Sequence, residues 1–303
     1  MKTSNLEKEI EKEQQSEKTT PPPISNDEAK ITQDPFRPTD ESLTIGDVEP
    51  YHKILLNKFM VIPEHLLIVT KEFEPQTDHL TLGDFQSIVS TFNQLHTEKD
   101  QDDYICFYNR GLYSGASQPH KHVQIVPKRE RNDETMQWSN VETFPLPEQF
   151  NKDVEEKGEK LRECALFPFL HQIRSVTTCF DSSDSATITQ NLYESYISIL
   201  KDLDLLNDRQ VSEEEERFLK VECLKGEIKE ISLSTKRFPS YNLLFNKKWM
   251  LIVPRRNENF MGISCNSLAF LHGFFCKTDY HWEKLKTEIQ IPRLLAHVTF
   301  PKQ

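Results

Sequence analysis

Short apolar segments bounded by proline, asparagine or charged residues constrain the fold of this chain most strongly. Such segments are typical of β-strands, which bury their side chains over only a few residues. The predicted strands cover residues 53–59, 65–70, 104–109, 120–126, 241–245, 249–253 and 269–276. Asn246, Lys247 and Lys248 separate two of them, which indicates a hairpin and therefore antiparallel pairing.

Helical periodicity marks three other segments. Thr81 and Asp84 form a capping-box pattern ahead of a first apolar stripe, and a second stripe follows near residue 192. The stripes consist of Phe85, Ile88, Val89, Phe92 and Leu95, and of Leu192, Tyr196, Ile199, Leu203 and Leu206. Residues 282–298 predict a last helix, interrupted near Pro292. Residues 128–184 are rich in proline and charge and stay unassigned, so the sequence predicts an α+β protein with an antiparallel sheet and packed helices.

Acidic residues outnumber basic ones. The chain has 48 Asp and Glu residues and 37 Lys and Arg residues, which gives a formal net charge of −11. This disfavours general nucleic-acid binding, which requires a surplus of basic side chains. No stretch reaches the roughly 20 apolar residues of a membrane helix, and the N-terminus lacks the apolar centre of a secretory signal. We expect a monomer without nucleic-acid or membrane partners, located in the cytoplasm or alternatively in the nucleus.

Composition and motif searches also indicate the state of the N-terminal segment and of the cysteines, and they exclude two common nucleotide-binding motifs. Residues 1–33 contain almost no large apolar side chains and predict a disordered acidic and polar tail. The acidic run at residues 213–216 predicts a solvated face. Cys106, Cys164, Cys179, Cys223, Cys265 and Cys276 form no CxxC pair, so we expect reduced, mostly buried thiols. Neither GxGxxG nor GxxxxGK[ST] occurs, which removes the main support for a Rossmann or P-loop nucleotide site.

The segment SGASQPHKHVQIVP, residues 114–127, carries the chemical signal. Alternation along a strand places His120, His122 and Gln124 on one face and leaves Val123 and Ile125 to anchor the other face in the core. A neutral imidazole is a nucleophile near pH 7, and we expect His122 to attack a phosphoryl or nucleotidyl centre.

The remaining candidates would bind phosphate. Ser114, Ser117 and the amides around Gly115 could hold phosphate oxygens, because small residues let the backbone approach closely. Gln124 could donate to a developing oxyanion. Lys58 and Lys277, each at a strand edge, are candidate charges for distal phosphates.

Less specific interpretations stay open. Two histidines at this spacing on a strand can chelate zinc or copper, although no cysteine or carboxylate lies nearby in sequence as a third ligand. The histidines could instead be hydrogen-bonded core residues. The two lysines could be ordinary exposed side chains, and the loop serines and glycine could only form turns.

The chain resembles the histidine-triad superfamily and, within it, the ATP adenylyltransferases, also called diadenosine tetraphosphate phosphorylases. The resemblance begins at Asp34-Pro35-Phe36 and includes LLNKFMVIPEHLLIVTKEF (residues 55–73), FYNRGLYSGASQPHKHVQIVP (107–127), SYNLLFNKKWMLIVPR (240–255) and residues 266–277. HxHxQ alone also occurs in galactose-1-phosphate uridylyltransferases, but the full set of motifs is specific. The resemblance implies a histidine-triad-like catalytic region at 34–190 and a C-terminal region at 191–303 that extends the same core.

The resemblance also implies a reaction, which is reversible, phosphate-dependent cleavage of diadenosine tetraphosphate into ATP and ADP through a nucleotidylated histidine. The family's nucleophile falls on His122, and His120 would orient the site. The family's binding positions fall on Lys58, Asn109, Ser114, Gly115, Ala116, Ser117, Gln118, Gln124, Asn266, Ser267 and Lys277. We expect no metal bound by the protein itself and Mg²⁺ that arrives with the nucleotide.

Three departures from the family pattern affect these expectations. Ala116 replaces the usual middle serine of SGSSQ, and one lost hydrogen bond costs about 1 kcal/mol. Leu268 replaces a threonine after Ser267, and the N-terminus lacks the family's preceding helix and strand. Two alternative functions follow: a dinucleoside polyphosphate hydrolase that uses water as the acceptor, and a catalytically silent nucleotide-binding protein.

Overall fold

The computed structural model describes residues 34, 36–37, 39–48, 50–95, 104–131, 138–142, 148–158, 161–206, 209–210, 236–237 and 240–302. The predicted tail at 1–33, the acidic run at 213–216 and Cys223 lie outside these residues. Within them, no helix is long and apolar enough to cross a membrane. The other five cysteines are free thiols, as expected.

An antiparallel sheet of eight strands forms the centre of the fold, in the order β1-β2-β3-β5-β4-β11-β12-β8. Its strands are β1 (Thr44–Val48), β2 (His52–Leu56), β3 (Leu66–Thr70), β4 (Tyr104–Arg110), β5 (His122–Pro127), β8 (Gln172–Ser175), β11 (Tyr241–Phe245) and β12 (Trp249–Pro254). Three small pairs lie outside this sheet: β6 (Arg129–Arg131) with β7 (Trp138–Glu142), β9 (Arg209–Gln210) with β10 (Lys236–Arg237), and β13 (Asn259–Phe260) with β14 (Ile263–Ser264).

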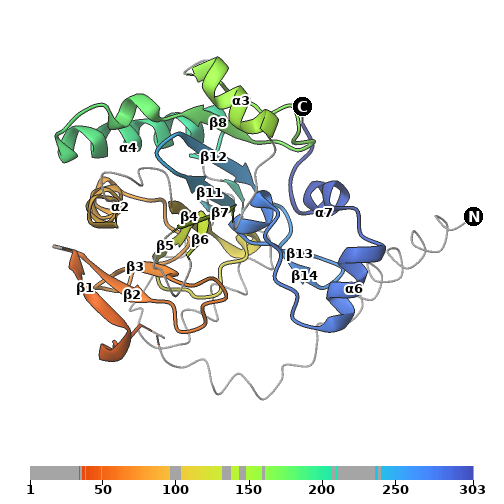
Figure 1. Ribbon diagram of the computed structural model, residues 1–303, viewed down its shortest axis with the longest axis horizontal. Helices are drawn as coiled ribbons and strands as arrows, with labels where there is room; N and C mark the ends of the chain where they lie inside the picture. The colour runs from red at the N-terminus through yellow and green to blue at the C-terminus, as the bar shows by residue number, and fades with distance from the viewer. Residues whose placement is uncertain are drawn as a thin grey trace, which may run out of the picture.

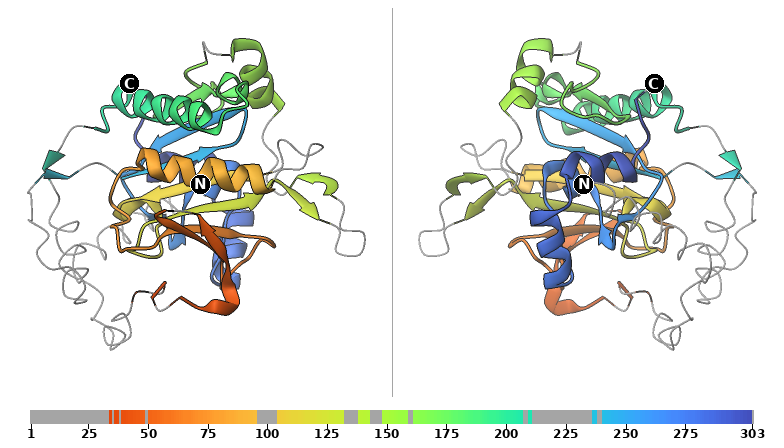
Figure 2. Two further views of the ribbon diagram at one scale, coloured as in Figure 1. Left: turned by 90° about the vertical axis from the view of Figure 1, so that its left-hand side faces the viewer. Right: turned by 90° about the vertical axis from the view of Figure 1, so that its right-hand side faces the viewer.

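Helices cover both faces of the sheet (Figure 1). Helices α2 (Leu82–Leu95) and α4 (Ser185–Asp202) pack on one face, where Val123 and Ile125 of β5 belong to the same apolar cluster. The opposite cluster contains Val126 together with residues of α3 (Glu148–Lys157), α7 (Ile291–Val298) and the 3-10 helix η6 (Ser267–Leu271). Helix α6 (Asp279–Thr287) lies beside α7, as Figure 1 and the right-hand view of Figure 2 show.

Six of the seven predicted strands are confirmed, as β2, β3, β4, β5, β11 and β12. The capping box of α2 is also confirmed, because Asp84 Oδ2 accepts from the Thr81 amide at 2.7 Å and Thr81 Oγ1 accepts from the Asp84 amide at 3.2 Å. Helix α4 begins earlier than the apolar stripe, at a cap formed by Asp184, so the boundary predicted after residue 190 falls within a helix.

The strand predicted at 269–276 is wrong. Residues 267–271 form η6, and the Asn266 side chain caps it by accepting from the Leu268 amide at 3.0 Å. All residues of η6 are buried, so the sequence shows no alternation that could distinguish a strand from a helix. The interruption predicted near Pro292 is confirmed, because α6 ends at Thr287 and α7 begins at Ile291, with the proline in its first turn, where a missing amide hydrogen costs nothing.

Candidate active site

A cavity of about 600 Å³ opens on the sheet face opposite α2 and α4, next to strands β2 to β5. This volume is typical of pockets for small molecules. The wall combines apolar and polar side chains. The apolar part includes Phe36, Leu55, Ile62, Leu67, Leu268 and Phe275, and the polar part includes Asn57, Lys58, His65, Asn109, Ser117, Gln118, His122, Gln124 and Asn266.

His122 is fixed in a single tautomer. Its Nδ1 lies 2.8 Å from the carbonyl oxygen of His120, which can only accept, so Nδ1 carries the proton and Nε2 keeps its lone pair. Burial lowers the pKa of His122 to about 4, and the imidazole is therefore neutral at pH 7. The ring of Phe36 packs against the imidazole, with 5.5 Å between the two ring centroids. A neutral, oriented imidazole in a cavity wall has the properties of a nucleophile.

Gln124 is oriented by His65, which the sequence analysis did not identify. His65 Nε2 lies 2.9 Å from Gln124 Oε1, and its Nδ1 lies 3.2 Å from the Asn57 side-chain nitrogen. Because an amide oxygen only accepts, His65 Nε2 carries the proton and Nδ1 accepts from Asn57. Burial lowers the pKa of His65 to about 4, so this arrangement holds at neutral pH. It leaves the Gln124 amide nitrogen to donate to a bound group.

His120 lies beside the cavity and does not line it. Its side chain is completely buried, with Nδ1 at 2.6 Å from Asp34 and Nε2 at 2.9 Å from Thr70 Oγ1. The imidazole of His120 is thus enclosed by protein groups. The contact of His120 with the site is made by its main-chain carbonyl, which accepts from His122 Nδ1. A direct role of the His120 ring on substrate does not fit this geometry, whereas a role in orienting His122 does.

A buried polar cluster holds Asn109 in the cavity wall. Asn109 Oδ1 accepts from Asn242 Nδ2 at 2.8 Å and from Ser267 Oγ at 2.6 Å. Arg255, which is fully buried, donates to Asn242 in turn. The Ser267 hydroxyl is therefore hydrogen-bonded inside the protein and does not line the cavity, and its expected role as a substrate ligand stays a prediction. Asn242 and Arg255 lie at the two ends of the motif at residues 240–255, but the sequence analysis assigned neither of them to the site.

The loop between β4 and β5 differs in part from the expected phosphate cradle. Gly115, Ser117 and Gln118 line the cavity, but Ala116 and Ser114 do not. The Ser114 hydroxyl is buried and donates to the Gly111 carbonyl at 2.7 Å, so it stabilises the loop and is not available to phosphate.

Gly115 is required by the packing of this loop. Its φ is +76°, and an added Cβ would lie 2.6 Å from the carbonyl oxygen of Cys265. The loop can therefore pack directly against residues 265–266, which places Asn266 in the same wall.

The two candidate lysines do not share a site. Lys58 lines the main cavity, whereas Lys277 lines a second, more open cavity of about 460 Å³ together with Trp282. Val61 and Phe275 belong to both walls, so the two cavities are neighbours.

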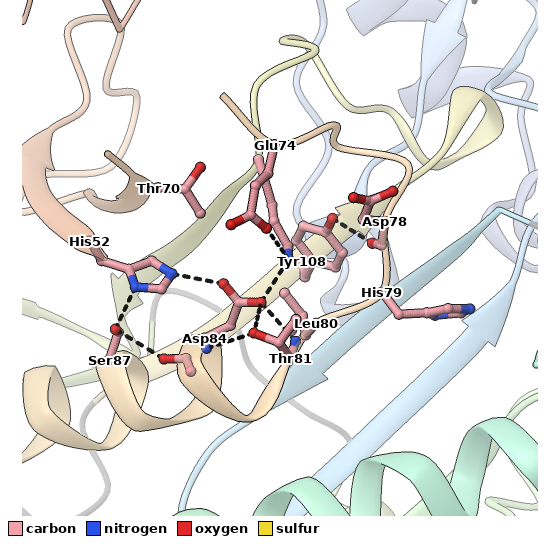
Figure 3. A network of polar contacts seen from close by, with 12 residues as sticks. His52, Thr70, Glu74, Asp78, His79, Leu80, Thr81, Asp84, Ser87 and Tyr108 are labelled. Atoms are coloured by element: carbon pink, nitrogen blue, oxygen red, sulfur yellow. Dashed lines mark hydrogen bonds and ion pairs between the residues drawn. The ribbon is translucent and has the colours of Figure 1, made fainter. Parts of the chain in front are cut away.

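An ion-pair network holds Lys121, the residue directly before β5, against helix α2 (Figure 3). Lys121 Nζ lies 2.7 Å from Asp84 and 2.9 Å from Glu74, and His52 Nε2 lies 2.7 Å from Asp84. Burial raises the pKa of Asp84, but the hydrogen bond from His52 and the charge of Lys121 outweigh it and lower the value to about 2. The ion pair between Lys121 and Asp84 therefore connects the start of β5 to the first turn of α2.

No group of three or more His, Cys, Asp or Glu side chains is placed to hold a metal ion in the part of the chain that the structure describes. The expectation that the protein itself binds no metal stays a prediction.

Two family models match the chain. The Ap4A phosphorylase N-terminal domain matches residues 2–140, and the ATP adenylyltransferase C-terminal domain matches residues 165–301. Because the first match begins at residue 2, the similarity extends further into the N-terminal segment than its motifs indicated.

Individual relatives agree with these models. The diadenosine 5',5'''-P1,P4-tetraphosphate phosphorylase 2 of Saccharomyces cerevisiae is 32% identical over 277 residues, which cover 87% of this chain and 74% of the relative. The yeast Ap4A phosphorylase Apa2 in complex with Ap4A has a TM-score of 0.63 and 25% identity, over 90% of this chain and 83% of that one. The same protein in complex with AMP has a TM-score of 0.64 and 25% identity, over 89% and 82%.

Proposed function

This chain belongs to the Ap4A phosphorylase family, and on that premise we propose that it cleaves diadenosine tetraphosphate into ATP and ADP with inorganic phosphate as the acceptor. The observation that carries the proposal is the state of His122, a neutral imidazole whose Nε2 is unprotonated in the wall of a nucleotide-sized cavity. Solved yeast relatives in complex with Ap4A and AMP support a nucleotide as the occupant.

The reaction proceeds in two displacements. His122 Nε2 attacks the α-phosphorus of one adenosine half, the bond from that phosphorus to the bridging oxygen breaks, and ATP leaves. An oxygen of inorganic phosphate then attacks the same phosphorus, the N–P bond breaks, and ADP leaves with His122 restored. Each displacement passes charge to the phosphoryl oxygens, which donors in the wall can stabilise.

Other residues bind and orient the substrate. The Gln124 amide nitrogen donates to an oxygen of the reacting phosphorus, since His65 holds the amide oxygen. Lys58 and the backbone around Gly115 to Gln118 bind phosphate oxygens, and apolar side chains such as Leu55 and Leu268 contact the base. Mg²⁺ enters as part of the nucleotide complex, so a chelated enzyme should regain its full rate with Mg²⁺ alone.

Product analysis tests the proposal. The purified chain is incubated with diadenosine tetraphosphate, with and without inorganic phosphate, and the nucleotides are separated by ion exchange next to a His122→Ala control. ADP plus ATP that form only with phosphate, and not in the variant, are the expected result. AMP plus ATP formed without phosphate would identify a hydrolase, and no turnover in either condition would identify a binding protein.

A further inference from the structure

Gln76 occupies an unusual place between two strands of the central sheet. The β4–β5 ladder runs from the Tyr104↔Pro127 pair to the Phe107↔Gln124 pair and stops there, although both strands continue. Continuing the same register would place Asn109 opposite His122. Both of these residues line the cavity.

The carboxamide of Gln76 takes the place of the missing ladder bond. Its Oε1 accepts from the His122 amide at 2.8 Å, and its Nε2 donates to the Asn109 carbonyl at 2.8 Å and to the His122 carbonyl at 3.3 Å. In an uninterrupted antiparallel pair these main-chain groups would bond to each other directly. The inserted side chain therefore binds both the His122 amide and the Asn109 carbonyl, and it takes up the space between the two strands that a direct main-chain hydrogen bond would close.

The surroundings hold Gln76 firmly. Its side chain is 2% exposed, its amide donates to the Pro119 carbonyl at 2.7 Å, and its carbonyl accepts from the Tyr108 hydroxyl at 3.0 Å. The residue is thus bound through its main chain to the loop before β5 and to β4, and its side chain bridges the two. Gln76 does not line the cavity, so it cannot contact a substrate.

We infer that Gln76 is a positioning residue for the nucleophile: its carboxamide separates β4 from β5 and thereby sets where His122 lies relative to Asn109. This inference rests on the proposed function, because it assigns His122 the attack on phosphorus. To bridge the His122 amide and the Asn109 carbonyl, a side chain must carry one acceptor and one donor and must be as long as glutamine. A misplacement of about 1 Å at a reacting group can reduce a rate by about 100-fold.

Two variants separate this role from simple stabilisation. Gln76→Glu keeps the shape, but an ionised carboxylate accepts only and would face the Asn109 carbonyl without a proton. Its protonated form again has one donor and one acceptor, so lowering the pH should restore the bridge. Burial against carbonyl groups raises the pKa of such a carboxyl. Gln76→Asn keeps the amide but is too short to reach both strands.

Two titratable residues that contact the Gln76 side chain or main chain, His122 and Tyr108, do not obscure this pH effect. His122 on β5 is already neutral because burial lowers its pKa to about 4. Burial raises the pKa of Tyr108 on β4 well above its ordinary value. The experiment compares about pH 5.5 with about pH 8, and neither group changes its charge between these two values.

The experiment measures adduct formation at His122 in a single turnover without phosphate, by intact-mass spectrometry of the full chain mixed with diadenosine tetraphosphate. The rate constant and the labelled fraction are recorded separately at both pH values, together with KM and the melting temperature. Thr91→Val is the matched control, since it also removes a buried hydrogen bond, from Thr91 to the Ser87 carbonyl in α2, away from the cavity.

We expect Gln76→Glu at pH 8 and Gln76→Asn at both pH values to label about 100-fold more slowly with unchanged KM, and Gln76→Glu to recover at low pH. Thr91→Val should label at the wild-type rate. Wild-type rates in both Gln76 variants, or a reduced labelled fraction with an unchanged rate constant, would overturn the inference. A wild-type chain that forms no adduct would overturn the proposed function and this inference with it.

Discussion

At the scale of single residues, the chemistry depends on which nitrogen of His122 carries a proton. The HxHxQ spacing predicted that His122 and Gln124 share a face, and the cavity lining agrees. The tautomer could not be predicted, because it depends on a carbonyl whose direction follows from the local backbone. His65 and Asn57 were also missed, since they act through contacts between strands that no local pattern reveals.

The pH dependence of the first displacement tests the state of His122. Because burial lowers its pKa from 6.5 to about 4, the nucleophile stays unprotonated as the pH falls through the ordinary histidine range. We expect the single-turnover rate of adduct formation to stay constant from pH 8 to about pH 5. Circular dichroism at each pH monitors folding, and a rate that declines with a midpoint near 6.5 would contradict this assignment.

Replacing His65 tests the support of Gln124. His65→Ala removes the donor that holds the Gln124 amide oxygen, so the amide should rotate and the rate of adduct formation should fall roughly 10-fold to 100-fold. His171→Ala is the control, because His171 is also buried, and it accepts from the Cys164 amide and donates to the Phe169 carbonyl outside the cavity wall. Equal effects of both variants on the rate would argue against a specific role of His65.

At the scale of elements, the regular strands could be predicted and the irregular segments could not. Short apolar segments and the residues that bound them indicated β2 to β5 and the β11–β12 hairpin. Strand β8 was missed because it is four residues long and only Ile173 is buried, so its position at the sheet edge depends on pairing with β12. The same lack of pattern concealed η6, whose first residues complete the Asn109 cluster.

The loop between β4 and β5 should be sensitive to one methyl group. Gly115→Ala places a Cβ at 2.6 Å from the Cys265 carbonyl, so the loop must move away from Asn266 and widen the cavity. We expect KM for diadenosine tetraphosphate to rise and kcat to fall.

Gly158→Ala provides the comparison for the loop variant. Gly158 also has a positive φ, of +49°, but an added Cβ meets nothing within 4 Å. It should lose about 1 kcal/mol of stability from backbone strain and keep its kinetic constants. Kinetic constants of Gly115→Ala that match those of Gly158→Ala would show that the close approach to Cys265 is unimportant.

At the scale of the whole molecule, buried histidines should make stability depend on pH. Burial lowers the pKa of His65, His122 and His171 to about 4 and that of His79 to about 3. Between these values and 6.5 the unfolded chain binds more protons than the folded chain, so lowering the pH favours unfolding.

We expect the free energy of unfolding to be unaffected by these groups above pH 7 and to fall steadily as the pH drops from 6.5 towards 4. Each pKa unit corresponds to about 1.4 kcal/mol per group. Asp84, whose lowered pKa is about 2, adds a loss of the same sign below its ordinary value of 3.8. Denaturant titrations across this range measure the slope, and a stability that rises on acidification would contradict the buried, neutral histidines.

The sequence predicted the fold class because one α+β core contains most of its motifs. It predicted the site less completely. Residues of one short loop, such as Ser114 and Ser117, have different environments, since the Ser114 hydroxyl binds the Gly111 carbonyl of the same loop and Ser117 lines the cavity. Lys277 was grouped with Lys58 by its charge, its expected place at a strand edge and the family resemblance, but the packing of α6 and its preceding loop places it in the neighbouring cavity.

The most direct test is to locate the covalent adduct. The chain is mixed with diadenosine tetraphosphate without phosphate, quenched at alkaline pH to preserve a phosphorus–nitrogen bond, digested, and mapped by peptide mass spectrometry. The double displacement predicts one adenylyl group on His122, which disappears with formation of ADP when phosphate is added. An adduct on another residue, or turnover with phosphate while no adduct forms at His122, would contradict it.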